Sequence, residues 1–281
     1  PWKYEEISVI LNITDLSSIE SRVLGWVADC KGINEAFATG KDTYKIFASE
    51  FYNVPYEQVT KKQRNFSKPP VLGAGYRLGA RGLVAYADGM GITMTEAEAE
   101  AAVNLFRYRL YPEVPEFWEW CKSAVFQVTQ FGGRVDGPHG LYVHAHGEFL
   151  FIHLPSGRQI AYHKPQIIDL PAPWDKDALI PQFTFMGREK LTYKWTRISA
   201  HDGHICENIV QAIARDILAE WMRRVAQSSY AIVLHVHDEI GVEHDDDVTE
   251  KLNALIRIPI EWAPGLLLDA EGFTTKRYRK G

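Results

Sequence analysis

The chain has 281 residues and a mass of 32.0 kDa, which is enough for two modest domains or one large one. Its composition, 46% hydrophobic and 24% charged, is that of a folded globular protein and excludes disordered, collagen-like and disulfide-scaffold proteins. Taken as a whole, the net charge of -5 argues against a nucleic-acid-binding protein. No apolar run reaches the roughly 18 residues of a membrane-spanning helix.

The N-terminal part of the chain predicts a strand followed by a helix. Residues 8–14 (SVILNIT) form a β-branched run that ends at Asp15. Residues 17–29 then place apolar side chains at helical spacing. The charged and aromatic residues that open the chain lack the pattern of a signal peptide, so secretion is not expected.

Residues 30–130 are predicted to be mainly helical. Thr95, with Glu98 three residues later, has the spacing of a capping box and predicts a helix that runs through an alanine-rich stretch to Leu110. A further helix is expected to reach about Gln130, where two glycines follow.

The pattern changes between residues 134 and 195 to short apolar runs separated by Gly and Pro, which predicts a β-rich insert. Residues 154–158 are expected to form a hairpin tip between the runs FLFIH and QIAYH. Helical spacing returns over residues 205–225, with one apolar stripe made by Ile209, Ile213, Ile217 and Trp221.

The C-terminal part predicts a hairpin and one more helix. Residues 231–236 (AIVLHV) and 240–243 (IGVE) are strand-like, and His237-Asp238-Glu239 lies where a tight connection is expected. A helix is predicted near residues 248–256, and the Pro- and Gly-containing tail suggests no further element.

Two carboxylates follow apolar runs that would fix their backbone, namely Asp15 and Asp238. Carboxylates from distant parts of a chain can hold two divalent cations roughly 3.5–4 Å apart, an arrangement that favours phosphoryl transfer. Oxygen ligands select Mg²⁺ or Mn²⁺ over zinc. The alternative is that both residues are ordinary turn or cap residues, because Asp is favoured there for local hydrogen bonding.

A second candidate site lies in the stretch KKQRNFSKPPVLGAGY at residues 61–76. Its members recur every four residues and would line one helix face, in the order cation, cation, apolar, aromatic: Arg64, Lys68, Leu72 and Tyr76. Two cations followed by a flat apolar surface suit a nucleoside triphosphate. The alternatives are a solvated basic helix and a face interrupted by a kink at Pro69-Pro70.

Charge is segregated along the chain in a way that matches these two sites. Residues 58–87 carry six Lys and Arg and no acidic residue, whereas residues 238–250 carry seven acidic residues and no Lys or Arg.

Zinc is not expected. Cys30, Cys121 and Cys206 are far apart and have no C-x-x-C spacing, which excludes a disulfide framework or thiolate zinc site and favours a reducing, cytoplasmic setting. The His144/His146 and His235/His237 pairs lack partners at recognisable spacing.

Four motifs in order along the chain resemble those of the family A DNA polymerases, the group typified by bacterial DNA polymerase I. The intervening residues, such as SRVLGWVAD and NIVQAIARD, look most like phage-encoded members. The motifs are Asp15-Leu-Ser-Ser-Ile-Glu20-Ser-Arg22, Arg64-xxx-Lys68-xxx-Leu72-Gly73-xx-Tyr76, Gln211-xxxx-Asp216 and Val236-His237-Asp238-Glu239.

The resemblance implies a metal site for two Mg²⁺ ions, with Mn²⁺ as a substitute. Asp15 and Asp238 would be its carboxylates, the backbone carbonyl of Leu16 a further ligand, and Glu239 an accessory acid. Catalysis would then use Asp15, Asp238 and Lys68.

The resemblance also implies roles in binding nucleotide and DNA. Arg64 and Lys68 would bind the triphosphate, and Lys68 would also protonate the departing pyrophosphate. Leu72 and Tyr76 would line the nucleotide pocket. Glu20 would exclude a ribose 2′-hydroxyl, although Ser17-Ser-Ile-Glu20 is also a capping-box sequence. His237 would contact the primer end and Gln211 the primer–template minor groove.

Some residues depart from the family pattern. Leu72 stands where Phe or Tyr is usual, which puts aromatic packing against the sugar in doubt. The proline pair at 69 and 70 is also unusual, and Glu207 rather than Asn lies four residues before Gln211. The insert has no expected role, and Arg158 at its hairpin tip is either an exposed turn residue or a nucleic-acid contact.

The implied fold is α+β, with an antiparallel palm sheet, a helical fingers region and a β-rich insert. The expected domains are residues 1–29 (first part of the palm), 30–133 (fingers), 134–199 (insert) and 200–281 (second part of the palm). A thumb and an exonuclease region are expected to be absent from this chain. The expected partners are primer–template DNA and deoxynucleoside triphosphates (dNTPs), with no membrane and a monomeric, cytoplasmic protein.

Two other functions remain open at this stage. A metal-dependent phosphodiesterase could use the same two aspartates but would not need the face that carries Arg64, Lys68 and Tyr76. A polymerase remnant would bind nucleotide or DNA without turnover.

Overall fold

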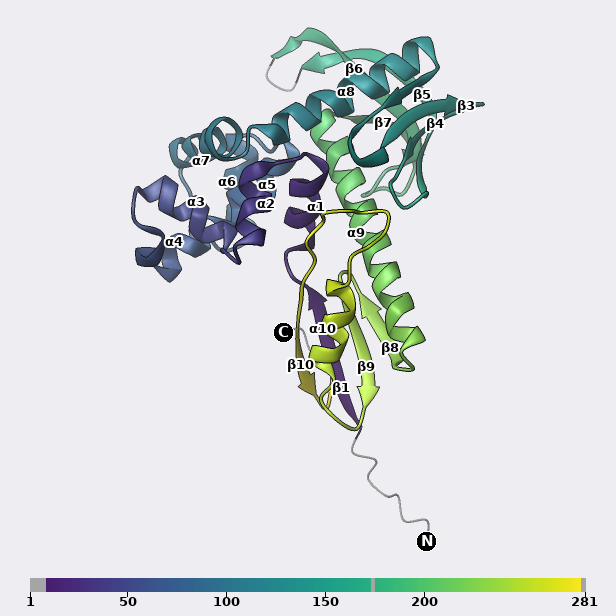
Figure 1. Cartoon of the computed structure of the whole chain (residues 1–281). Helices are drawn as coiled ribbons and strands as arrows, with labels where there is room; N and C mark the ends of the chain where they lie inside the picture. Colours follow the sequence, from purple (N-terminus) through teal and green to yellow (C-terminus); the bar gives the residue numbers. More distant parts are fainter. Residues whose placement is uncertain (1–8, 173–174, 279–281) are drawn as a thin grey trace. The chain divides into compact units, whose positions relative to one another are not determined.

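The computed structural model describes residues 9–172 and 175–278, which fall into two compact units. The first unit combines the chain up to Val23 with residues 213–281, and the second comprises Leu24–Ala212 (Figure 1). Two helices, α1 (Ile19–Val27) and α9 (Asp202–Gln227), include residues of both units.

The first unit is built on a four-stranded antiparallel sheet with the order β10-β1-β9-β8. The β-branched run of the N-terminal segment places β1 in the interior of the sheet, where Ile13 and Leu16 are buried. Helix α10 packs against β1 and β10. The elements are β1 (Ile10–Leu16), β8 (Ala231–Val236), β9 (Glu239–His244), α10 (Thr249–Arg257) and β10 (Ala270–Thr275).

A buried asparagine joins β1 to the segment before α10. The Asn12 side chain is fully buried, accepts a hydrogen bond from the Val248 backbone at 2.8 Å and donates one to the Asp246 carbonyl at 3.2 Å. Both ends of the amide are therefore satisfied, which is the condition for burying such a group without a large penalty.

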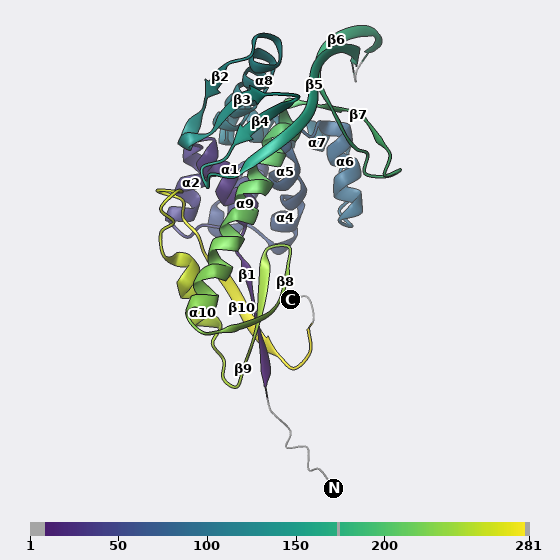
Figure 2. The same ribbon diagram turned by 90° about the vertical axis from the view of Figure 1, so that its right-hand side faces the viewer.

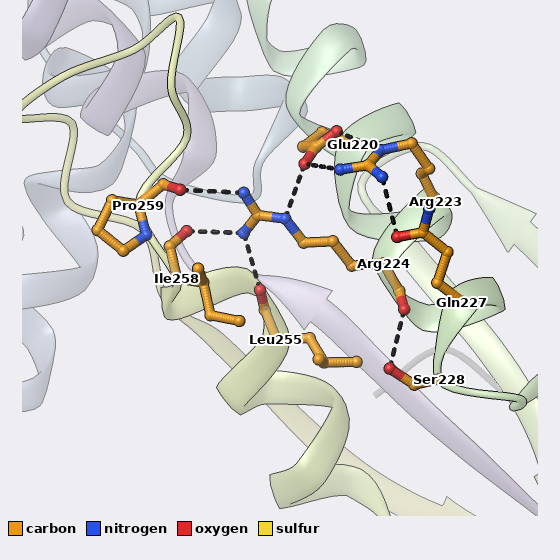
Figure 3. Close-up of polar contacts among 8 residues, drawn as sticks. All are labelled: Glu220, Arg223, Arg224, Gln227, Ser228, Leu255, Ile258 and Pro259. Atoms are coloured by element: carbon orange, nitrogen blue, oxygen red, sulfur yellow. Dashed lines mark hydrogen bonds and ion pairs between the residues drawn. The ribbon is translucent and has the colours of Figure 1, made fainter.

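Arg224, near the end of α9, closes the C-terminal end of α10 (Figure 3). Its side chain is 11% exposed, bonds Glu220 at 2.8 Å and donates to three backbone carbonyls that follow or end α10: Leu255, Ile258 and Pro259. The last carbonyls of a helix have no partners within the helix, so this guanidinium supplies donors that the backbone lacks.

The second unit begins with short helices whose ends are set by local sequence. Thr60 and Thr95 both form capping boxes, the second with Glu98 as predicted, and Asp42 caps α3. The segments are α2 (Lys31–Ala38), α3 (Thr43–Tyr52), η1 (Tyr56–Gln58), α4 (Lys61–Phe66), α5 (Lys68–Gly73), η2 (Ala74–Tyr76), α6 (Ala80–Gly89), α7 (Glu96–Asn104), the π-helical η3 (Leu105–Leu110) and α8 (Glu113–Phe131).

The predicted β-rich segment forms a six-stranded antiparallel sheet in which sequence neighbours pair in order. Helix α8 contacts β2, β3, β4 and β5 (Figure 2), and buried residues such as Val143 and Ile152 form the inner face. The elements are β2 (Arg134–Asp136), η4 (Pro138–Gly140), β3 (Tyr142–His146), β4 (Phe149–His153), β5 (Gln159–Ala172), β6 (Asp175–Arg188) and β7 (Trp195–Ala200).

Most of the elements predicted from sequence are present, with two differences near the N- and C-terminal ends. Asp15 does not end its strand but lies within β1, which extends to Leu16. The tail was predicted to hold no element, yet β10 pairs with β1. The stripe of Ile209, Ile213, Ile217 and Trp221 on α9 is completely buried, as predicted. Among the described residues, no helix is both long and apolar enough to cross a membrane.

Replacing Arg224 by Met should lower the free energy of unfolding of the first unit by about 2–4 kcal/mol, because it removes the donors to three carbonyls and unpairs Glu220. Arg223→Met is the matched control. Arg223 binds the same Glu220 but its side chain is 55% exposed, so its loss should change stability by less than about 1 kcal/mol. Urea unfolding of both variants measures the difference, and equal losses would contradict the assignment.

Candidate active site

Three carboxylates lie in one cross-strand row of the first unit. In the register of the sheet, Asp15 on β1 is directly opposite Glu239 on β9 and Glu271 on β10. Side chains at directly paired positions point to the same face, with Cβ atoms about 4.5–5.5 Å apart. The sheet therefore brings together three acids that are far apart in the sequence.

Asp238 joins this row through the hairpin that connects β8 to β9. The Leu16 backbone N–H donates to the Asp238 carbonyl at 3.1 Å, which ties the hairpin turn to the end of β1. His237, the other turn residue, is exposed and has a φ of 54°. Asp15 on β1 and Asp238 in the β8–β9 turn are thus linked through the hydrogen bond between the Leu16 N–H and the Asp238 carbonyl.

The row is electrostatically unfavourable by itself, because like charges directly opposite each other destabilise a sheet. Asp15 and Glu271 are exposed, whereas Glu239 is 7% exposed and accepts a hydrogen bond from the Tyr278 hydroxyl. A divalent cation with oxygen ligands would relieve the repulsion, and these hard donors fit Mg²⁺. Over the described residues, no three His, Cys, Asp or Glu side chains already converge on one point suited to a metal ion.

Glu20 lies in the first turn of α1, two residues after Ser18, whose φ is 53°. The capping-box interpretation of Ser17 to Glu20 is wrong, because within the described chain the buried Ser17 hydroxyl has no hydrogen-bond partner. The turn is instead held by Arg22, whose Nε donates to the Ser17 carbonyl at 2.7 Å and whose Nη1 donates to the Leu267 carbonyl at 2.8 Å.

The predicted nucleotide-binding face lies in the second unit, on three short helical segments rather than one helix. Segment α4 ends at Phe66, α5 begins at Lys68, and η2 ends at Tyr76. Pro69 and Pro70 occupy the first turn of α5, where a missing backbone N–H removes no intrahelical bond. Most of the residues between the four predicted side chains are buried. The four predicted side chains themselves are partly exposed: Arg64, Lys68, Leu72 and Tyr76.

Arg64 is positioned by residues of α3. Its Nε bonds Asp42 Oδ2 at 2.5 Å, and its guanidinium lies 5.2 Å from the centre of the Tyr44 ring. The other carboxylate oxygen of Asp42 accepts from the backbone of Tyr44 at 2.8 Å and of Lys45 at 3.2 Å. The Asp42 carboxylate thus caps α3 with one oxygen and binds the Nε of Arg64 with the other.

The turn that carries Tyr76 is held from α8 and α9. The Trp118 indole N–H donates to the Gly75 carbonyl at 2.9 Å in a buried contact, and Arg77, with a φ of 68°, pairs with Asp202 at the start of α9. Burial raises the pKa of Asp202, but hydrogen bonds from His201 and Arg77 outweigh it and hold that pKa below its usual range.

A close backbone approach completes this arrangement. A Cβ atom on Gly203 would overlap the Tyr76 carbonyl oxygen and the Arg77 side chain. Glycine is therefore required where α9 begins against the Tyr76–Arg77 turn.

The remaining residues considered for nucleic-acid contact lie in the middle of α9 and at the hairpin tip before β5, and they differ in exposure and in hydrogen bonding. Gln211 is exposed, so it is accessible to a ligand. Asn208 donates to the Tyr162 hydroxyl at 2.9 Å, a structural contact within the second unit. Arg158 is exposed at the end of the hairpin turn, as one of the two expectations had it, and its Nη2 also donates to the Ala212 carbonyl at 2.7 Å.

The cysteines do not contribute chemistry to these sites. Cys30, Cys121 and Cys206 are buried and unpaired with one another, and burial raises the pKa of the Cys30 thiol to about 12. All three are therefore protonated near neutral pH and are poor metal ligands or nucleophiles.

Two residues that belong to these sites were not identified from sequence. Glu271 lies in a segment without a clear strand pattern, and only its pairing with β1 places it beside Asp15. Asp42 followed by Thr43 at a helix start indicates an N-cap, but its second contact, with Arg64, depends on the packing of α3 against α4.

Comparisons with known proteins agree with the motif resemblance. Residues 4–132 match the family model described as DNA polymerase family A. The DNA polymerase of Bacillus phage SP02 is 34% identical over 272 residues, which is 95% of this chain and 41% of the phage protein. The DNA polymerase I of Mycobacterium tuberculosis (strain ATCC 25618 / H37Rv) is 37% identical over 73 residues, 26% of this chain and 8% of that protein.

The fold also has a match among solved structures. The "POL domain of Pol1 from M. smegmatis complex with DNA primer-template and dNTP" superposes with a TM-score of 0.60 at 21% identity, covering 95% of this chain and 39% of that one. The chain thus spans about two fifths of the length of the SP02 polymerase and of the mycobacterial chain.

Gly203→Ala should destabilise the second unit by about 1–3 kcal/mol, because the added methyl group overlaps backbone atoms that cannot move independently. The matched control is Gly89→Ala at the end of α6, where a Cβ would meet nothing within 4 Å. There the change should be neutral or stabilising by up to about 1 kcal/mol. Thermal unfolding of the two variants tests the close approach, which is refuted if Gly203→Ala is as stable as the parent.

Proposed function

We propose that this chain, whose residues 4–132 match the family model for DNA polymerase family A, carries the catalytic residues for template-directed DNA synthesis. The substrates would be a primer–template and dNTPs. The primer 3′-hydroxyl oxygen would form a bond to the α-phosphorus of the dNTP, in line with the departing oxygen. Pyrophosphate would be released and the primer would become one nucleotide longer. We propose that the chain is a monomer with palm residues 1–29 and 200–281, fingers residues 30–133 and an insert at 134–199.

The observation that carries this proposal is the row of carboxylates at the end of β1. Asp15 and Asp238 would hold two Mg²⁺ ions, with the Leu16 carbonyl as a further ligand and Glu239 as an accessory acid. When bound, such ions stabilise charge on the attacking and departing oxygens. The hydrogen bond from Tyr278 engages one oxygen of Glu239, which supports a secondary role for that residue.

The partly exposed side chains of α4, α5 and η2 would bind the dNTP. Arg64 presents its guanidinium edge-on from Asp42, and Lys68 would place an ammonium on the phosphates and a proton on the departing pyrophosphate. Tyr76 and Leu72 would line the pocket for the nascent base pair. Leu72 is aliphatic, so it would contact the sugar by van der Waals packing and not through an aromatic ring.

The remaining assignments concern DNA and sugar selection. Glu20 would exclude the ribose 2′-hydroxyl, His237 would contact the primer end, and the exposed Gln211 would contact the minor groove of the primer–template. These are proposals from the motif positions, supported by the exposure of His237 and Gln211.

Single-nucleotide extension of a labelled primer–template tests the proposal directly. With Mg²⁺ or Mn²⁺ and each dNTP singly, we expect incorporation of the templated nucleotide. Asp238→Ala should reduce the rate by at least about 100-fold, because it removes a carboxylate that holds the cations. Lys68→Ala should lower both dNTP affinity and rate.

The same assay separates the alternative functions. A phosphodiesterase would shorten the primer and would be indifferent to Lys68→Ala. A remnant would bind triphosphate, measured by equilibrium titration, without extending the primer. Glu250→Ala, a change to an exposed acid on α10, is the matched control for Asp238→Ala and should leave extension unchanged.

A second prediction concerns Asp42 as the residue that orients Arg64. Asp42→Ser keeps a good helix cap but is too short to reach the guanidinium, so it should raise the KM for dNTP about 10-fold with a smaller change in kcat. Asp42→Asn retains both the cap and a hydrogen bond and should be affected less.

A double-mutant cycle provides the control for this prediction. If Asp42 acts through Arg64, Asp42→Ser should have no further effect on KM in an Arg64→Ala background. Additive effects of the two changes would show instead that Asp42 contributes only to the stability of α3.

A further inference from the structure

The face of the six-stranded sheet opposite α8 carries a continuous group of rings. Residues alternate between the two faces along each strand, and the buried positions Val143, Leu150 and Ile152 face the helix side. The positions between them carry aromatic or imidazole side chains. We call this group the outer aromatic face: Tyr142, His144, Phe149, Phe151, His153, His163 and Trp195.

The rings of this face touch one another in series across three strands. The ring centres of Tyr142 and His144 are 5.5 Å apart, those of His144 and Phe151 5.3 Å, those of Phe151 and Phe149 5.7 Å, and those of Phe149 and His163 4.9 Å. Trp195 extends the series at 6.0 Å from His163. The contacts follow the register of β3, β4 and β5 and so are fixed by strand pairing.

Neighbouring rings on this face range from nearly parallel to tilted, with inclinations between 16° and 44°. Tyr142 and His153 are inclined by only 16°, and Phe149 and Phe151 by 30°. On the buried side, Tyr162 packs edge-on against Phe183 at 85°.

The platform remains partly open to solvent. Trp195 is 62% exposed and Phe149 is 38% exposed. Next to Trp195, the hairpin between β6 and β7 presents Tyr193 at 66% exposure, with the Arg188 guanidinium 4.7 Å from the centre of its ring.

Cations border the platform and make it suited to phosphate. The Arg134 guanidinium lies 3.6 Å from the Tyr142 ring centre while also pairing with Asp136 at 2.6 Å, and Lys164 pairs with Glu148 at 3.4 Å. Residues 134–200 contain eight Lys and Arg against six Asp and Glu, although in the whole chain acids outnumber bases, 36 to 31. The insert is therefore positive within a negative chain.

The imidazoles are not arranged as a metal site. Among the described residues no cluster of three His, Cys, Asp or Glu suits a metal ion, and His144 has its pKa lowered by burial and by neighbouring His153, His146 and Arg134.

We propose that the outer aromatic face binds single-stranded DNA, with bases stacked on its rings and phosphates near its Arg and Lys side chains. Aromatic platforms bordered by cations are the usual physical solution for binding unpaired nucleotides without sequence preference. Double-stranded DNA hides its base faces and gains nothing from the rings. None of the residues of this face is among the proposed catalytic residues, and binding there does not require turnover.

Fluorescence anisotropy of a labelled oligodeoxythymidylate, with the full chain and EDTA in place of divalent metal, tests this site. Trp195→Ala and Phe149→Ala should each weaken binding about fivefold to tenfold, the loss expected for one stacked base. Tyr108→Ala and Phe131→Ala are the matched controls, because these rings are 74% and 82% exposed but lie on η3 and α8. They should change affinity less than twofold.

An oligomer of abasic sites with the same length and charge distinguishes stacking from phosphate binding. It should bind the parent chain more weakly than oligodeoxythymidylate does and should be insensitive to Trp195→Ala. Equal affinity of the parent and both ring variants for oligodeoxythymidylate would overturn the proposal.

Extension of a primer on a template without a long single-stranded arm should be unaffected by Trp195→Ala. This keeps failure of the platform distinguishable from failure of the proposed catalysis. If Trp195→Ala abolishes extension on such a short template, the ring acts in catalysis or folding and the separate site is refuted.

Discussion

Repulsion among carboxylates on neighbouring strands is the constraint around which the first unit is organised. The register sets Asp15 between Glu239 and Glu271, so the sheet must hold like charges together at one edge of its face. Stabilisation comes from elsewhere in the same unit. Buried Asn12 and Arg224 satisfy backbone groups around α10, which packs on the strands that carry the acids.

The second unit uses a different strategy, because its candidate ligand-binding side chains lie on short helical segments that have little stability of their own. Each segment is fixed by a contact from another element. Asp42 holds Arg64, while Trp118, Asp202 and Gly203 surround the turn after η2. The partly exposed side chains are therefore positioned by buried groups behind them.

Sequence patterns predicted the elements that have strong local signals. The capping box at Thr95, the hairpin before Arg158 and the buried stripe of α9 were all evident from spacing. Strand pairings between segments that are distant in the sequence were not evident from spacing. Glu271 follows a tail without alternation, and the break between α4 and α5 depends on where the prolines fall within a turn. The roles of the site residues remain predictions, because their spacing identifies candidates but not ligands.

Arg77 and His237 share an unusual backbone conformation, with φ values of 68° and 54°. Glycine adopts this region without strain, whereas other residues incur about 1 kcal/mol or more. One of these residues follows Tyr76 and the other precedes Asp238. At both places the strained backbone adjoins a candidate site residue, and at Arg77 the side chain is held by its ion pair with Asp202.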